Sequence, residues 1–355
     1  MQQHNSSSET IEQIFSLFRH GRRNEIINLK TQEIKGLISN EALTEIDNKA
    51  LQFKQSFLSN IKPNLNITKD CSFYISDSPR TIETFLHRIS TFFPEHNELL
   101  SLTKMQLITK HNAIFDEYMY TGFVKCSERL NEYFDNNETF NSLLTNINSK
   151  LQNEPEVYKL YQSYLNLDLF VNEKYHMFLK LIYICDYYNT TSDTLNDNDI
   201  KLKYVLNELN VYRVLIDISN EDKDLNVIFN WRILSSINDE ISQSDNKKKL
   251  ILFSGHDYNI SAMLKAFGID YMKYKYYYND EINFVHVKEN DSHYIKLYYN
   301  NELIINPLCN STKCPINVFT DYIKEKFNIN TELYDKYSKG ELKTFIDIHK
   351  QNKEM

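Results

Sequence analysis

The sequence predicts an α/β protein with a mixed, mainly parallel sheet flanked by helices and a mostly α-helical insertion, or cap. Two observations predict this class. Short apolar runs typical of buried strands occur three times, and each leads into a loop and then an amphipathic helix. Residues 96–245 have few such runs and carry several helical periodicities. We therefore expect an α/β core made of residues 1–95 and 246–355, and a helical insertion at 96–245.

The first unit begins with the apolar run Ile14–Phe18, which predicts a buried strand. It leads directly into Arg19-His20-Gly21-Arg22-Arg23. The spacing of the apolar residues that follow predicts an amphipathic helix over 41–59. Its apolar positions, three or four residues apart, are Leu43, Ile46, Ala50, Phe53 and Phe57.

The second unit has a strand at Phe73–Ile75, ended by the turn-forming sequence Ser76-Asp77-Ser78-Pro79. A helix is expected from Arg80 to near Pro94. Its apolar face comprises Ile82, Phe85, Leu86, Ile89 and Phe92.

The third unit has a strand at Leu250–Ser254, the loop Gly255-His256-Asp257 and a further helix. Residues 282–287 and 293–299 alternate in hydrophobicity and predict an antiparallel hairpin. The remaining C-terminal part is expected to be helical.

Composition excludes several function classes. The net charge is −8 and no basic run exceeds three lysines, so a broad nucleic-acid surface is not expected. With 6 Gly, the chain has no Gly-rich nucleotide-binding loop. No apolar run reaches the roughly 18 residues that a transmembrane helix needs. Met1–Thr10 are polar, so no signal peptide is visible.

The 5 Cys do not have the spacing of a zinc site, and no metal site is predicted. Cys309 and Cys314 are close enough in sequence to form a small disulfide loop in an oxidising compartment. The alternative is five reduced thiols.

The three loops all follow predicted strands, and ligands of open α/β sheets bind at the carboxyl ends of strands. Arg19, Arg23 and Arg80 are three of only 8 Arg in the chain. Guanidinium groups bind phosphate oxygens bidentately and keep their charge. A neutral imidazole, His20, can attack phosphorus, and the carboxyl group of Asp257 can protonate a leaving alkoxide. The set predicts metal-independent phosphoryl transfer without a cofactor, in which Gly21 and Gly255 let the backbone approach the ligand.

Three motifs resemble those of the histidine acid phosphatases, branch 2 of the histidine phosphatase superfamily, and within it the prostatic and lysosomal type. They are Arg19-His20-Gly21-Arg22-Arg23, Ser76-Asp77-Ser78-Pro79-Arg80-Thr81 and Ser254-Gly255-His256-Asp257. The resemblance spans roughly residues 11–325. It implies that His20 is the nucleophile that becomes phosphohistidine and that Asp257 is the general acid. It also implies that Arg19, Arg23, Arg80 and His256 bind the phosphate.

The chain departs from the family pattern at three places. Glu25 replaces a proline and brings a negative charge near the expected anion site. Tyr258 replaces a small residue after the His-Asp pair and is expected to narrow the pocket. Cys126 matches a paired family position but has no partner Cys near the C-terminus, and Cys71 and Cys185 also lack obvious partners.

The leading expectation is an acid phosphatase that hydrolyses small phosphate monoesters. A phytase or lysophospholipid phosphatase of the same family is the second hypothesis, and a catalytically silent binding or structural relative is the third. The resemblance implies a lysosomal or secreted location, with a cytoplasmic one as the alternative, and a homodimer. The tyrosine clusters at 276–278 and 298–299 are interpreted as sheet packing.

Overall fold

The computed structural model describes residues 9–24, 28–32, 36–61, 65–116, 133–134, 136–167, 177–191, 193–219, 221–243, 247–269 and 277–327. The chain divides into two compact units. The first comprises Met1–Arg22, Asn40–Gly122 and Asn226–Met355, and the second comprises Arg23–Ser39 and Phe123–Leu225. No helix in the described ranges is both long and apolar enough to cross a membrane.

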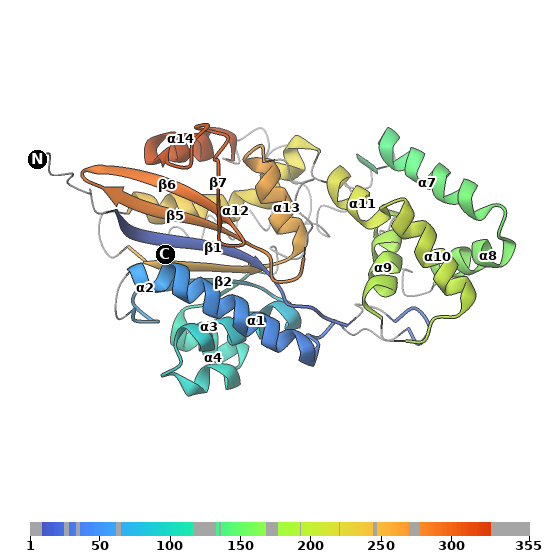
Figure 1. Cartoon of the computed structure of the whole chain (residues 1–355), viewed down its shortest axis with the longest axis horizontal. Coiled ribbons are helices and arrows are strands. Elements are labelled where there is room, and N and C mark those ends of the chain that lie inside the picture. The colour runs from blue at the N-terminus through green and yellow to red at the C-terminus, as the bar shows by residue number, and fades with distance from the viewer. Residues whose placement is uncertain are drawn as a thin grey trace, which may run out of the picture. The chain divides into compact units, whose positions relative to one another are not determined.

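The first unit contains a sheet of eight strands in the order β3-β2-β4-β1-β5-β6-β7, with β8 paired to β6 (Figure 1). Strands β3, β2, β4 and β1 are parallel, and the remaining pairings are antiparallel. The strands are β1 (Thr10–Arg19), β2 (Cys71–Ser76), β3 (Ile114–Asp116), β4 (Leu250–Gly255), β5 (Glu281–Glu289), β6 (Ser292–Tyr299), β7 (Glu302–Ile304) and β8 (Cys314–Pro315).

Helices cover both faces of this sheet (Figure 1). One face carries α1 (Asn40–Phe53), the π-helical turn η1 (Lys54–Leu58), α2 (Ser59–Ile61), α3 (Pro79–Phe92), the 3-10 helix η2 (Asn97–Ser101) and α4 (Lys104–His111). The other carries α12 (Lys223–Ser242), α13 (Asp257–Ala266) and α14 (Ile316–Lys326).

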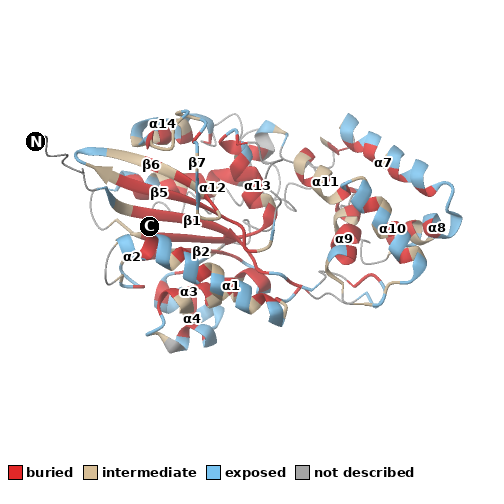
Figure 2. Ribbon diagram, viewed as in Figure 1, coloured by how far each residue is buried: buried red, intermediate tan, exposed pale blue. Residues whose placement is uncertain are grey.

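Alternation of side chains along the central strands explains the two layers. Ile14 and Phe18 of β1 face the core that contains α1 and α3, whereas Phe15 and Leu17 face the core that contains α12, α13 and α14. In β4, Leu250 and Leu252 alternate with Ile251 and Phe253 in the same way. Figure 2 shows these strands buried along most of their length, as expected for parallel strands covered on both faces.

The second unit is helical in its described part. It contains α7 (Glu138–Leu151), α8 (Pro155–Leu165), α9 (Met177–Thr190), α10 (Asp197–Glu208) and α11 (Val211–Ser219). Its buried Asp199 accepts hydrogen bonds from the hydroxyls of Tyr164 and Tyr188 and lies 3.1 Å from the ammonium group of Lys30. Burial opposes ionisation of Asp199, but these donors outweigh it and hold its pKa below the ordinary value.

The predicted fold class is confirmed: a mixed sheet lies between helical layers, and the described part of 136–219 is helical apart from its connecting segments. The predicted hairpin is confirmed as β5 and β6, which pair from Ile282 with Tyr299 to Glu289 with Ser292. Strand β3 was not expected. It adds three residues to the sheet inside the range 96–245, where the sequence shows few strand signals.

Candidate active site

The three motif loops follow the carboxyl ends of β1, β2 and β4, at the same end of the sheet. Strand β4 lies between β1 and β2 and is parallel to both, with Arg19 opposite Gly255 and Ile75 opposite Ser254. The carboxyl ends of the three strands are therefore adjacent. This is the edge at which open parallel sheets bind ligands.

His20 directly follows β1, and its side chain is buried. Its Nδ1 lies 2.8 Å from the carbonyl oxygen of Gly21. A carbonyl oxygen only accepts hydrogen bonds, so Nδ1 carries the proton and donates it. In this tautomer the lone pair of the neutral ring is on Nε2, the nitrogen that a nucleophilic role would use.

His256 links the ends of β2 and β4 to helix α3. Its Nε2 lies 2.8 Å from the Ser76 hydroxyl, and its Nδ1 lies 3.4 Å from a terminal nitrogen of Arg80. Guanidinium nitrogens only donate, so Nδ1 accepts and Nε2 donates to Ser76. The His20 and His256 rings meet edge to face, with centroids 5.3 Å apart.

The Arg19 guanidinium joins the end of β1 to the start of α13. Its Nη2 forms a 2.9 Å salt bridge with the carboxylate of Asp257, and both side chains are about nine-tenths buried. Its Cζ lies 4.3 Å from the ring centroid of Tyr278, within the range of a cation–π interaction. Arg19 is therefore held from two sides.

A turn at residues 277–281 completes this arrangement, and sequence reasoning missed it. The Asn279 amide donates to the His20 carbonyl, and the Arg19 amide donates to the Asp280 carbonyl, at 3.2 and 2.8 Å. The Tyr278 ring lies 5.8 Å from the His20 ring. The interpretation of Tyr278 as sheet packing is therefore wrong, because this turn bends back to the end of β1.

A buried ion pair supports the same turn. Arg88 of α3 and Glu281 at the start of β5 are both fully buried, with 2.6 Å between their charged atoms. Arg88 also donates to the Asn279 carbonyl and stacks over the ring of Phe18. Asp280 is held by the Tyr299 hydroxyl, and burial raises its pKa. The composition gave a signal here, since scarce arginine occurs at position 88, but its partner is 193 residues away.

The two glycines of the motifs make room for protein atoms. A Cβ at Gly21 would lie 2.5 Å from the Cδ1 of Ile46, and one at Gly255 would lie 2.7 Å from the Oδ1 of Asn259. That oxygen accepts the backbone N–H of His256. The amide of Gly21 donates to Thr84 of α3. At both positions the absence of a Cβ allows close packing against side chains of α1 and α13.

Arg23 belongs to the second unit, where it pairs with Asp186 of α9. The two terminal guanidinium nitrogens bind the two carboxylate oxygens at 3.0 and 2.6 Å, and both side chains are 4 % exposed. The structure therefore brings Arg19, His20, Arg80, His256 and Asp257 together in the first unit and gives Arg23 a carboxylate partner in the second. The sequence contained no signal for Asp186 as that partner.

The remaining residues named in the sequence analysis are Tyr258, Glu25 and the five cysteines. Tyr258 stacks nearly parallel on the His256 imidazole, with centroids 5.4 Å apart. Glu25 and Cys126 lie outside the described residues. Cys71 and Cys185 are buried, and burial raises the pKa of the Cys185 thiol. The expected disulfide between Cys309 and Cys314 is confirmed.

The described residues contain no group of three or more His, Cys, Asp or Glu side chains that could hold a metal ion. The candidate site is built from two imidazoles, two guanidinium groups and one carboxylate. Two guanidinium groups beside two imidazoles make this set suited to binding an anion.

Neither a protein-family model nor a curated protein sequence matches the chain. Solved structures do match it. A phytase of Klebsiella sp. ASR1 aligns with a TM-score of 0.55 and 11 % identity, covering 90 % of this chain and 97 % of that one. A Hafnia alvei phytase in complex with myo-inositol hexakis sulphate aligns with a TM-score of 0.56 and 10 % identity, covering 90 % and 98 %.

A multiple inositol polyphosphate phosphatase of Bifidobacterium longum, in complex with inositol hexasulfate, aligns with a TM-score of 0.55 and 7 % identity, covering 86 % of this chain and 88 % of that one. The alignments extend over nearly the whole of each partner, so they include the sheet and both helical layers. At such low identity they establish the fold alone. The chain therefore has the fold of the histidine acid phosphatases, the family that its three motifs resemble.

Proposed function

We propose that this chain is a metal-independent acid phosphatase that hydrolyses phosphate monoesters through a phosphohistidine at His20. The observation that carries the proposal is the tautomer of His20. The hydrogen bond from Nδ1 to the Gly21 carbonyl fixes the tautomer in which Nε2 carries the ring lone pair, and this ring lies at the carboxyl ends of the strands beside Arg19 and His256. The shared fold with phytases supports the same class of reaction.

In the first half-reaction, the Nε2 of His20 forms a bond to phosphorus as the bond from phosphorus to the leaving oxygen breaks. The electron pair stays on that oxygen, which takes the proton of the Asp257 carboxyl group. Arg19 and Arg80 donate to the equatorial oxygens, and His256, whose Nε2–H donates to Ser76, holds the Arg80 guanidinium at the site through Nδ1. Such donors stabilise charge on the transferring phosphoryl group. Arg23 stays in the proposed phosphate-binding set on its motif position alone.

In the second half-reaction, water attacks the phosphohistidine and the Asp257 carboxylate takes its proton. The N–P bond breaks and its electron pair returns to Nε2. Inorganic phosphate leaves, and Asp257 is protonated again for the next cycle. Apart from water and the substrate, the cycle uses only side chains of this protein, so turnover is expected to persist with chelator present.

The decisive experiment compares His20→Ala with His87→Ala, a half-buried histidine on α3 outside the site. We expect His20→Ala to abolish hydrolysis of a simple aryl phosphate at about pH 5, and His87→Ala to retain it. Wild-type enzyme quenched in base during turnover should carry phosphate that is labile to acid and stable to base. Near wild-type turnover by His20→Ala, with a normal circular dichroism spectrum, would refute the assignment.

The structural neighbours favour a second substrate class, the inositol polyphosphates, because two of them were solved with sulfate analogues of such a ligand. A panel containing phytate, a lysophospholipid phosphate and a small aryl phosphate separates the candidates. Preference for phytate by kcat/KM would select the phytase. Zero turnover on all of them by folded protein would favour a silent binding relative.

The disulfide between Cys309 and Cys314 supports a lysosomal or secreted location, because disulfides persist mainly in oxidising compartments. Blocking and mapping the cysteines in protein isolated from its native cells tests this. A Cys309–Cys314 pair recovered fully reduced would favour the cytoplasm.

A further inference from the structure

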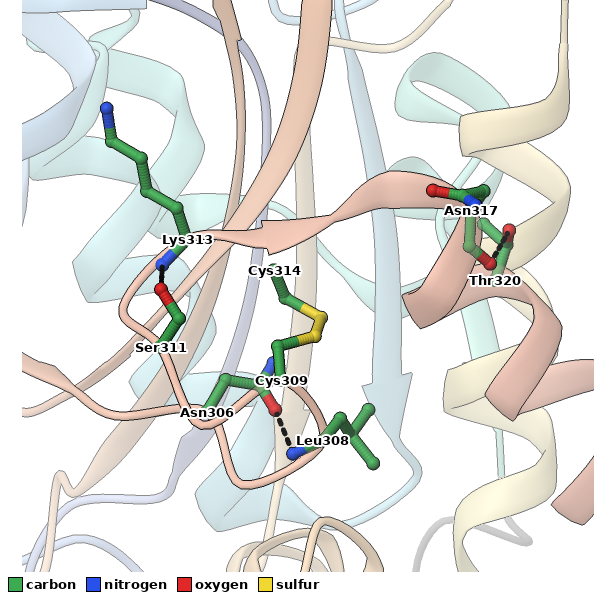
Figure 3. Close-up of a disulfide and its surroundings, with 8 residues drawn as sticks. All are labelled: Asn306, Leu308, Cys309, Ser311, Lys313, Cys314, Asn317 and Thr320. Atoms are coloured by element: carbon green, nitrogen blue, oxygen red, sulfur yellow. Dashed lines mark hydrogen bonds between the residues drawn. A yellow bond between two sulfur atoms is a disulfide. The ribbon is translucent and has the colours of Figure 1, made fainter.

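The small disulfide loop contains an acceptor sequence for N-linked glycosylation, Asn310-Ser311-Thr312. Asn310 is exposed and has a φ of 46°, in the left-handed region that asparagine tolerates. Figure 3 shows that neighbouring polar groups close the loop: the Asn306 side chain accepts from the Leu308 amide, and the Ser311 hydroxyl accepts from the Lys313 amide. None of the hydrogen bonds described in this loop uses the Asn310 side chain.

Most of the other acceptor asparagines in the described ranges are engaged or poorly placed. Asn66 accepts from the amides of Thr68 and Lys69, and Asn137 caps helix α7 through Phe140. Asn259 is 3 % exposed and holds the His256 amide, so the folded chain has no room for a glycan there. Asn189 lies within helix α9, and Asn290 lies at the β5–β6 turn. Asn310 is distinguished by its place in a loop closed by a disulfide.

We propose that Asn310 is a site of N-linked glycosylation. Disulfides and N-linked glycans are both added in the secretory pathway, so a single compartment would supply both modifications of this loop. The disulfide also fixes the loop with Cys314 in the core and Asn310 outside it. A glycan on Asn310 would therefore extend into solvent without displacing any described contact of its side chain.

The position also gives the glycan a physical role. Strand β7 is the last strand in the sheet order, and exposed sheet edges pair readily with other chains. Leu303 in β7 and Ile305 just beyond it are 43 % and 59 % exposed. The next residue, Asn306, forms a β-bridge with Ser311, so Asn310 lies close to this apolar edge. A glycan there would cover it.

The test is to secrete the full chain from a eukaryotic host behind an added signal sequence and to map glycopeptides. We expect N-glycosidase to lower the mass and to convert Asn310 to aspartate. Thr312→Ala should abolish that change without altering the left-handed residue, and Asn310→Gln, which replaces that residue, should also abolish it. Asn66→Gln is the matched control and should leave the modification of Asn310 intact.

An unmodified Asn310 in secreted chains with an intact Cys309–Cys314 bond would overturn the proposal. A separate measurement tests whether the glycan covers the apolar edge at β7. We expect Thr312→Ala to lose monomer faster than wild type on mild heating, followed by size-exclusion chromatography. Equal loss from glycosylated wild type and Thr312→Ala would refute the role assigned to the glycan.

Discussion

Replacing His286 with asparagine should remove much of the pH dependence of the unfolding free energy below pH 7. His286 lies in β5 and is 2 % exposed. Its Nδ1 is 3.0 Å from the Oε1 of Gln13, whose Nε2 donates to the carbonyls of Glu240 and Lys248. The orientation of Gln13 is therefore fixed, and Nδ1 of His286 must donate. Its Nε2 then accepts from Nδ1 of His293, 2.9 Å away.

A second proton on His286 would remove that acceptor. Burial is the main cause that lowers the pKa of His286 to about 3, and the positive charges of His293, Lys247 and Lys249 add to it. The unfolded chain keeps the ordinary value of 6.5. It therefore binds more protons than the folded chain as the pH falls, so this group's contribution to stability is complete above about pH 6.5 and is lost progressively down to about pH 3.

The size of the effect follows from these two values. Between about pH 7.5 and pH 5, the unfolded state gains roughly 2 kcal/mol from protonation of this one group, while the folded state gains almost nothing. Urea unfolding at both pH values should show His286→Asn losing roughly 2 kcal/mol less than wild type. His87→Asn should keep the wild-type dependence.

An equal loss of stability in wild type and His286→Asn would refute this reasoning. Should the variant not fold, an NMR titration of wild-type His286 provides the test. A midpoint near the ordinary value of 6.5 would contradict a pKa lowered by burial.

Three further changes test the site. Asp257→Asn should lower kcat on alkyl phosphates by about 10² or more but affect an activated aryl ester less, because only poor leaving groups need the proton; equal losses on both would contradict a general-acid role. Tyr278→Leu should raise KM for phosphate esters about 5-fold, because the contact between the ring and Arg19 is lost, whereas Tyr278→Phe should not. Equal KM values for the two variants in a steady-state assay would argue against a role for the aromatic ring. Gly21→Ala should cost about 1–3 kcal/mol in urea unfolding because its Cβ meets Ile46, and adding Ile46→Val should recover part of that; no recovery would show that another contact is responsible.

Sequence patterns predicted the structure correctly where all the residues of a pattern lie within one segment of the chain. The apolar run at 14–18 predicted a buried strand, and the alternation at 282–287 and 293–299 predicted a hairpin. The alternation corresponds to burial on one face in β6, whereas β5 is buried on both faces from Glu281 to Val287. The cysteines at 309 and 314 are five residues apart, so their pairing also depended on local chain geometry.

Contacts between residues far apart in the sequence were not predicted. Tyr278 contacts Arg19 across 259 positions of sequence, and Arg88 pairs with Glu281 across 193. Scarce arginine marks one partner of each pair, but nothing in the sequence identifies Tyr278 or Glu281 as the other. Strand β3 is only three residues long, too short for any periodicity to show.

The sequence by itself determined the strand–loop–helix units and the residue types at the end of each strand, because hydrophobic periodicity and turn chemistry are properties of neighbouring residues. Only the tertiary structure decided that β4 lies between β1 and β2, which tautomer His20 adopts, and that the turn at 277–281 supports Arg19. Those features depend on pairings and hydrogen bonds between segments far apart in the chain, and such pairings leave no periodic trace in either partner.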